Sequence, residues 1–237
     1  MHLQIAPLEQ FRFFRERPVE QPDQLQLLTA PTPNGVKVSI MLEEIGIPYQ
    51  AHRIDISRGD TRKPEFLALN PNGKLPVIVD PHIEGNNPLV LWESGAILIY
   101  LAEKSGSLLP TSVAARSATI QWLMYQVSGF GPVLGQLEWF HCFDGREVED
   151  PRPRVRSAKE ARRLLAVLDK QLSGREWIVG ESYTIADIAM LGWIEYIGRN
   201  QELRDVLGLE EYVKVLAWLA RGLDRTAVQA GLLVGRD

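Results

Sequence analysis

The signals for β-strands stop less than halfway along this chain of 237 residues. Residues 25–104 alternate short apolar runs with helical patterns, in the order strand, helix, strand, helix, strand, strand, helix. Beyond a short segment with Gly106 and Pro110, every apolar pattern has helical spacing. These later patterns occupy residues 114–127, 155–172, 185–198 and 210–223. The sequence therefore predicts an α/β unit followed by an all-helical unit, each with its own hydrophobic core.

The composition disfavours several classes of protein. The net charge is −4 and no long basic run is present, which argues against nucleic acid as a partner. No window reaches the ~18 uninterrupted apolar residues of a membrane span. The first 24 residues carry charges of both signs and no apolar core, so they do not read as a signal peptide. We therefore expect a cytoplasmic protein with no membrane partner.

Cysteine usage limits the chemistry that the chain can supply itself. Cys142 is the only cysteine, which excludes an intrachain disulfide and any CxxC redox or zinc motif. A buried or incidental thiol is the ordinary explanation for such a residue. We expect no metal cofactor.

Residues 29–37 join the first predicted strand to the first predicted helix. Two prolines end the strand, Asn34 is a suitable N-cap, and Gly35 permits close approach of the backbone. The first N–H groups of the helix are then expected to face an open mouth, where the helix dipole stabilises an anion by about 0.3–1 kcal/mol. An ordinary strand-to-helix turn is the alternative.

A thiolate is one anion that suits this mouth, because helix N-termini lower thiol pKa values. No cysteine lies near residues 29–37, so a thiolate here must arrive on a ligand. The Thr32 hydroxyl and the Asn34 amide are the available side-chain donors.

Three further motifs mark the boundaries of predicted elements. Proline is unusual at the start of a central strand, and a cis Leu75-Pro76 peptide would accommodate it while freeing the Leu75 backbone for a ligand. Glu93-Ser94 opens the last helix of the first half. Residues 183–188 form a capping box, in which Thr184 caps a helix and Asp187 reaches back, and we interpret this motif as structural.

Together these motifs resemble the cytosolic glutathione transferases over residues 25–225. Residues 32–35, 93–97 and 129–136 are similar in particular to the bacterial Nu class, whose members lack the catalytic Tyr, Ser or Cys of other classes at the first strand and are noted for glutathione-dependent disulfide reduction. Taken alone, residues 129–136 also fit a helix broken by Pro132.

The resemblance implies a fold class and domain limits. It implies an α/β thioredoxin-like N-terminal domain plus an all-α C-terminal domain, the glutathione transferase architecture. The limits are an N-terminal arm at 1–24, a glutathione-binding domain at 25–105, a linker at 106–111 and a helical domain at 112–237. Members of this family pair as homodimers, so we expect one here.

For the sulfur end of glutathione, the resemblance implies three catalytic residues. Thr32 and Asn34 would face the sulfur from the first turn. Arg156 aligns with an arginine that the Nu class projects toward the same sulfur from the helical domain.

For the rest of glutathione, the resemblance implies a binding set in the first domain. Lys74 would approach a carboxylate, and Leu75, joined to Pro76, would offer its backbone N–H and C=O to the cysteinyl part. Glu93 would bind the γ-glutamyl ammonium and Ser94 its carboxylate, which matches the charges. Taken one at a time, Glu93 and Ser94 also fit an ordinary helix start.

The implied function is disulfide reduction by thiol–disulfide exchange, with glutathione as co-substrate and attacking thiolate. Conjugation of glutathione to an electrophile, or reduction of a peroxide, uses the same thiolate and stays open. A non-enzymatic binding or regulatory protein of this fold is the alternative from another class. The short arm, which is not rich in Asn or Gln, gives that alternative little support.

Overall fold

The structure is a computed structural model that describes residues 7–17, 19–83 and 87–236. It divides into two compact units, Met1–Ser105 with Ala227–Asp237, and Gly106–Thr226. The domain limits expected from the sequence remain a prediction, and the described chain adds that residues after 226 belong with the first unit. Residues 1–6 and 18 of the expected N-terminal arm lie outside the described residues.

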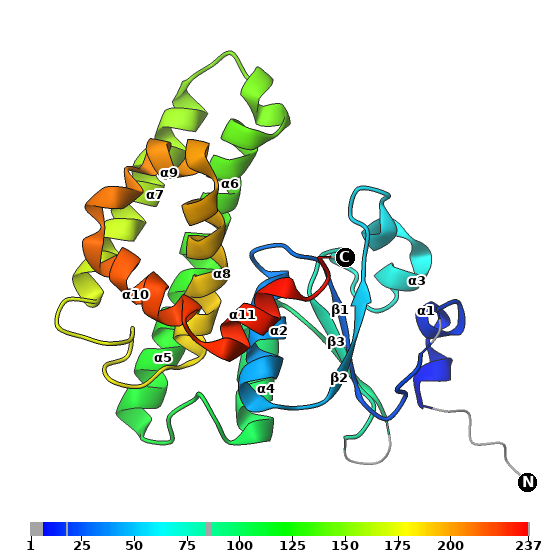
Figure 1. Cartoon of the computed structure of the whole chain (residues 1–237). Helices are drawn as coiled ribbons and strands as arrows, with labels where there is room; N and C mark the ends of the chain where they lie inside the picture. The colour runs from blue at the N-terminus through cyan, green and yellow to red at the C-terminus, as the bar shows by residue number, and fades with distance from the viewer. Residues whose placement is uncertain (1–6, 18, 84–86, 237) are drawn as a thin grey trace, which may run out of the picture. The chain divides into compact units, whose positions relative to one another are not determined.

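The first unit is built on a four-stranded mixed sheet (Figure 1). The strands are β1 (Leu25–Thr29), β2 (Tyr49–Arg53), β3 (Val77–Asp80) and β4 (Leu89–Trp92). Their order is β2-β1-β3-β4, with β2 parallel to β1 and both other pairs antiparallel. The third strand begins at Val77 rather than at Leu75 as predicted, because Pro76 has no N–H for the ladder.

Helices cover both faces of this sheet, as Figure 1 shows. On one side lie α2 (Gly35–Ile45), α4 (Ser94–Ser105) and α11 (Thr226–Leu233). Gly46 ends α2 in the left-handed conformation at φ 64°. No separate sequence pattern predicted α11, whose Gly231 carbonyl accepts a 2.7 Å hydrogen bond from Ser39 Oγ of α2.

Residues 7–17 of the N-terminal arm pack on the other face of the sheet. Here lie a 3₁₀ turn at Pro7–Gln10, α1 (Arg12–Arg15), a 3₁₀ turn at Asp60–Arg62 and α3 (Pro64–Leu67). Phe13 and Phe14 are buried against Leu28, Ile54 and Phe66.

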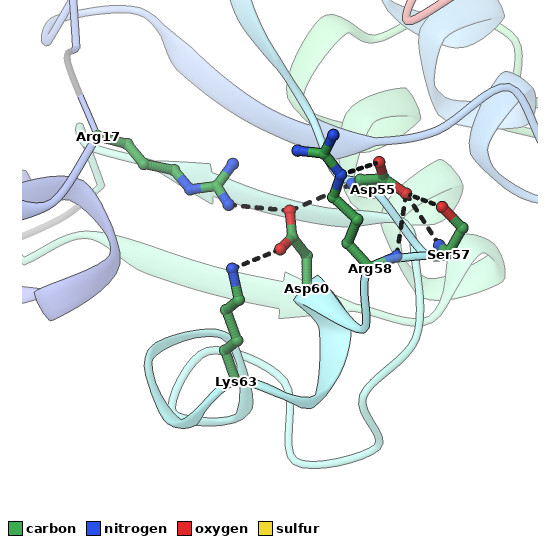
Figure 2. A network of polar contacts seen from close by, with 6 residues as sticks. All are labelled: Arg17, Asp55, Ser57, Arg58, Asp60 and Lys63. Atoms are coloured by element: carbon green, nitrogen blue, oxygen red, sulfur yellow. Dashed lines mark hydrogen bonds and ion pairs between the residues drawn. The ribbon is translucent and has the colours of Figure 1, made fainter.

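Polar contacts tie the arm to the segment after β2 (Figure 2). Arg17 pairs with Asp60 at 3.1 Å and Lys63 pairs with the same carboxylate at 2.6 Å. Asp55 accepts hydrogen bonds from the backbone and the hydroxyl of Ser57. The hydrogen bond from Lys63 is the largest of the contacts that lower the pKa of Asp60. The arm is therefore held by both apolar burial and charge.

The second unit is helical, as predicted. Its α-helices are α5 (Val113–Tyr125), α6 (Gly131–Cys142), α7 (Arg152–Gln171), α8 (Ile185–Arg199), α9 (Gln201–Leu207) and α10 (Val213–Leu223). Short turns lie at Gln126–Phe130 (π-helical), Asp144–Glu147 and Leu209–Glu211. The π-helical turn joins α5 to α6 with helical backbone angles at Tyr125, Phe130 and Gly131, so the helix is not broken at Pro132.

The capping box at the start of α8 is complete. Asp187 is fully buried and accepts hydrogen bonds from the backbone N–H of Thr184, from Ile178 N and from Trp218 Nε1. It joins α8 to α10 and to the loop before α8, which confirms the structural interpretation of this motif. Of the helices in the described part of the chain, none is long and apolar enough to cross a bilayer.

Candidate functional site

Three chain segments meet at one end of the sheet in the first unit. Val77, the first residue of β3, lies opposite Leu28 of β1 on one side and Trp92 of β4 on the other. Beyond Leu28 the chain enters the turn before α2, beyond Trp92 it enters α4, and residues 74–76 lead into Val77. The strand register therefore brings together the three segments for which the resemblance implies glutathione binding.

The turn before α2 closes tightly on itself. Thr32 Oγ1 accepts a 3.1 Å hydrogen bond from Gly35 N–H, and the Thr32 carbonyl accepts one from Val36 N–H. A Cβ on Gly35 would lie 2.1 Å from the Ala30 carbonyl oxygen, so the position requires glycine. The close approach predicted at Gly35 is thus made to the chain's own turn.

Two expectations for this turn were wrong. Asn34 has helical angles, φ −88° and ψ −35°, and its side chain makes no capping hydrogen bond, so Thr32 is the residue that caps α2. The first N–H groups of the helix do not all face an open mouth, because two of them bind Thr32. Both Thr32 and Asn34 are nevertheless half-exposed, so a ligand can reach them.

The entry to β3 has the predicted backbone conformation. The Leu75-Pro76 peptide is cis. Asn70 Nδ2 donates a 2.7 Å hydrogen bond to the Lys74 carbonyl and fixes the preceding turn. Lys74 is exposed, Leu75 is half-buried and Pro76 is buried, so the first two can meet a ligand at this edge.

Glu93 adopts a backbone conformation that non-glycine residues rarely take. Its φ is 72°, which costs about 1–3 kcal/mol and is found mainly at functional positions. Asn72 Nδ2 lies 3.4 Å from Glu93 Oε1. Ser94 follows as the first residue of α4 and is only 7% exposed. An exposed carboxylate therefore stands beside a buried hydroxyl at a helix N-terminus.

Lys37 is a residue of this region that the sequence reasoning missed. Its side chain is buried, and its Nζ lies 3.4 Å from Ser94 Oγ. Burial lowers the pKa of Lys37 to about 7, against the charge of Glu93, which raises it. The available signal was its position between Val36 and Val38 in an apolar run, since a lysine there needs polar partners.

Arg156 lies in the second unit, where it lines a cavity of about 770 Å³. Trp139 and Phe140 of α6 contribute aromatic surface to this cavity. Arg152 also lines it and is paired with Asp150 at 2.6 Å, whereas Arg156 is exposed. The carboxylates of Asp150 and Glu160 line the cavity as well, so it combines aromatic surface with charges of both signs.

Cys142 is the last residue of α6. Burial raises the pKa of its thiol, and Asn200 Nδ2 lies 3.5 Å from its sulfur. A raised pKa leaves little thiolate near neutral pH, and the thiolate is the nucleophilic form of cysteine, so Cys142 is poorly suited to act as a nucleophile. Among the described residues, no cluster of His, Cys, Asp or Glu is arranged to hold a metal ion.

Known protein families match both units of the chain. Residues 32–104 match the glutathione S-transferase N-terminal domain, and residues 141–225 match the C-terminal domain. The disulfide-bond oxidoreductase YfcG of Escherichia coli K12 is 41% identical over 210 residues, which cover 88% of this chain and 94% of that protein. The chain belongs to the glutathione transferase family. The resemblance and the fold class predicted from the sequence are confirmed.

Solved glutathione transferases with ligands bound share this fold. A family member from Pseudomonas fluorescens, crystallised with two glutathione bound, is 54% identical with a TM-score of 0.90 and matches 92% of this chain and 96% of its own. A glutathione transferase from Pseudomonas putida, with one glutathione disulfide bound per subunit, is 50% identical with a TM-score of 0.93, over 96% of this chain and 98% of its own.

Proposed function

We propose that this glutathione transferase binds glutathione at the end of the sheet in its first unit and uses the glutathione thiolate to reduce disulfides. The relatives that are bound to glutathione or its disulfide support the ligand, and YfcG, which is named a disulfide-bond oxidoreductase, supports the reaction. The proposed roles belong to the three segments that meet at this end of the sheet. Thr32 and Asn34 hold the sulfur, Lys74 and Leu75-Pro76 the glycyl and cysteinyl parts, and Glu93 and Ser94 the γ-glutamyl group.

The hydrogen bond between Gly35 N–H and Thr32 Oγ1 is the observation that carries this proposal. A hydroxyl has one proton to donate and two lone pairs to accept. Because the oxygen of Thr32 already accepts an N–H, its own proton can point to a ligand. Polarisation by that N–H strengthens the donation, so Thr32 is suited to stabilise a thiolate.

The reaction needs two glutathione molecules and no protein thiol. The thiolate of the first attacks one sulfur of the substrate disulfide, forming a mixed disulfide and releasing the other half as a thiolate, which takes up a proton. The thiolate of a second glutathione then attacks the glutathione sulfur of the mixed disulfide. This step yields glutathione disulfide and the second product thiol, so two electrons pass from glutathione to the substrate.

For the second unit, we propose that the cavity beside Arg156 binds a glutathione-sized molecule. Glutathione and its disulfide carry both carboxylates and ammonium groups, so a lining with exposed Arg156, the carboxylates of Asp150 and Glu160, and the aromatic surface of Trp139 and Phe140 supports this proposal. The proposed action of Arg156 on sulfur rests on the resemblance to the Nu class.

Turnover distinguishes this function from its alternatives. We expect reduction of 2-hydroxyethyl disulfide with glutathione, and much slower reduction when free cysteine replaces glutathione. Faster conjugation of 1-chloro-2,4-dinitrobenzene than disulfide reduction would favour the transferase alternative. Tight binding of glutathione without either reaction would favour a regulatory protein and contradict the proposal.

We also propose that the protein is a homodimer, as the family resemblance implies. The exposed apolar side chains of α5, Val113 at 83% and Met124 at 41%, are compatible with a covered surface. Light scattering at micromolar concentration should give twice the chain mass of 26.7 kDa. A mass of one chain contradicts the dimer.

A further inference from the structure

Lys37 is unusual because its amine lies in the interior of the first unit. The side chain is 1% exposed, although lysine is among the residues least often buried. It extends from the first turn of α2, the helix that begins at the proposed sulfur site, toward the N-terminus of α4. Burial of an ammonium is costly unless nearby groups stabilise its charge.

The Lys37 amine faces the proposed γ-glutamyl site. Ser94 Oγ is 3.4 Å from Nζ, and Glu93 is the charge that acts on the amine. β1 and α11, which also contact α2, contain no titratable side chain. Tyr100, Glu103 and Lys104 of α4 lie more than one helical turn beyond Ser94.

We propose that Lys37 is a positioning residue that orients the Ser94 hydroxyl and provides the counter-charge for the α-carboxylate of the γ-glutamyl group. This inference rests on the proposed binding of glutathione at Glu93 and Ser94. When the Ser94 oxygen accepts a hydrogen bond from Lys37, its own proton is turned outward to donate to the carboxylate. The ammonium also attracts that carboxylate through a poorly solvated region, where charges interact strongly.

Binding of glutathione should then be linked to a proton. The pKa of Lys37 is lowered to about 7 by burial, so above pH 7 much of the amine is neutral before the ligand arrives. A carboxylate placed beside Ser94 favours the ammonium and raises that pKa. The protein must therefore take up a proton on binding, and affinity must fall as pH rises above 7.

Calorimetry with S-methylglutathione tests this linkage, because the blocked thiol cannot titrate. Titrations at pH 7.5 in Tris and in phosphate, which differ in ionisation enthalpy, measure the protons taken up. We expect uptake of about half a proton per site in the natural protein. Lys37→Met should remove this uptake and weaken binding about tenfold. Lys37→Arg, which keeps a permanent charge, should remove the uptake as well.

Lys104→Met is the matched control. Lys104 is a partly buried lysine of the same unit that pairs with Asp80 at 2.6 Å, so its loss should lower stability and leave proton uptake unchanged. Unchanged uptake and affinity in Lys37→Met would overturn the role of Lys37. If Lys37→Met fails to fold, the pH dependence of S-methylglutathione affinity in the natural protein tests the inference. An affinity that stays constant between pH 6.5 and 8.5 overturns it.

Ser94→Ala separates this inference from the function on which it rests. Weaker binding in Ser94→Ala with no effect of Lys37→Met would contradict only the role of Lys37. If the natural protein did not bind S-methylglutathione, or if Ser94→Ala bound it normally, the proposed glutathione site would fail together with this inference.

Discussion

The helices α2 and α8 begin in similar ways but serve different purposes. Each has a threonine whose hydroxyl accepts a backbone N–H near the helix start, Gly35 N–H for Thr32 and Ala186 N–H for Thr184. Thr184 is 1% exposed and bonded to the buried Asp187. Thr32 is half-exposed and lies at the sheet end where three segments of the proposed site meet.

The two helix starts differ in whether the chain itself supplies a carboxylate for the N–H groups there. At α8 a carboxylate of the chain occupies the place of an anion and is surrounded by N–H donors. At α2 no acidic residue lies in the first turn, and the neighbouring Asn34 is neutral. The helix start that lacks its own anion is the one suited to receive an anion from a ligand.

Asp187→Ala should have the largest effect and should act on stability. The change leaves the buried N–H groups of Ile178, Thr184 and Trp218 without their acceptor, which costs about 3–5 kcal/mol of the free energy of unfolding. Urea denaturation measures this loss. In the variant protein that remains folded, the thiol of bound glutathione should keep its pKa. A shift of that pKa would contradict a purely structural role for the start of α8.

Thr32→Ala should act on the reaction. The hydrogen bond from a hydroxyl to a thiolate is charge-assisted and stabilises it by about 1.5–3 kcal/mol, so glutathione-dependent disulfide reduction should fall about tenfold or more. The pH–rate profile should move to higher pH, because the bound thiol loses a donor and its pKa returns toward about 8.5. Glutathione affinity should change less, since in the proposed site it depends mainly on Leu75, Glu93 and Ser94.

Thr184→Ala is the matched control for that change. It removes a capping threonine from α8 and should cost about 1 kcal/mol of stability without moving the pH–rate profile. Thr32→Ser, which keeps the hydroxyl, should retain most of the activity. Full activity and an unshifted pH–rate profile in Thr32→Ala would show that the thiolate is not stabilised at this turn.

Asn34→Ala should lower the rate of disulfide reduction by about tenfold, through loss of the amide donor. Asn200 offers a comparison, because it is the N-cap of α9 and its side chain accepts a 3.1 Å hydrogen bond from Leu203 N–H. Asn200→Ala should reduce the free energy of unfolding by about 1 kcal/mol and leave the rate unchanged. Equal rates for Asn34→Ala and the natural protein would restrict the sulfur site to Thr32.

Local sequence signals predicted those elements whose ends are marked by particular residues, such as a capping box or a proline. The capping box marks the start of α8, and Pro76 marks the start of β3, which begins one residue later. The packing of α11 on α2 was not predicted, because it depends on the contact of Gly231 with Ile40, which lies far away in the sequence.

The candidate site was predictable in outline and less so in detail. Strand register brings Thr32, Leu75 and Glu93 to one end of the sheet, and the motifs had already marked all three. The capping role passed from Asn34 to Thr32 because the turn closes tightly around Gly35, a tertiary feature. Lys37 escaped notice because its significance lies in burial and in its distance from Ser94, and neither property follows from residue order.

Cys142→Ser should have the smallest effect and is the sharpest test of the source of the thiolate. The Cys142 thiol has a pKa raised by burial, and the carboxylates of Glu202 and Glu138 raise it further against opposing contacts from Asn200 and Arg146. As the only cysteine in the chain, it is also the only protein thiol that could relay a disulfide. Serine keeps the size and a hydrogen-bonding atom, so stability should change little.

If glutathione supplies the attacking thiolate, Cys142→Ser should reduce 2-hydroxyethyl disulfide at the rate of the natural protein across the whole pH range. Alkylation of the natural protein with iodoacetamide, after removal of glutathione, should likewise leave the rate unchanged. Loss of activity in the serine variant, with the fold intact by circular dichroism, would contradict attack by the glutathione thiolate. It would favour a mechanism in which the Cys142 thiol relays the disulfide. The half-exposed start of α2 would then no longer be where the reacting sulfur is stabilised, and its contrast with the buried start of α8 would lose its functional meaning.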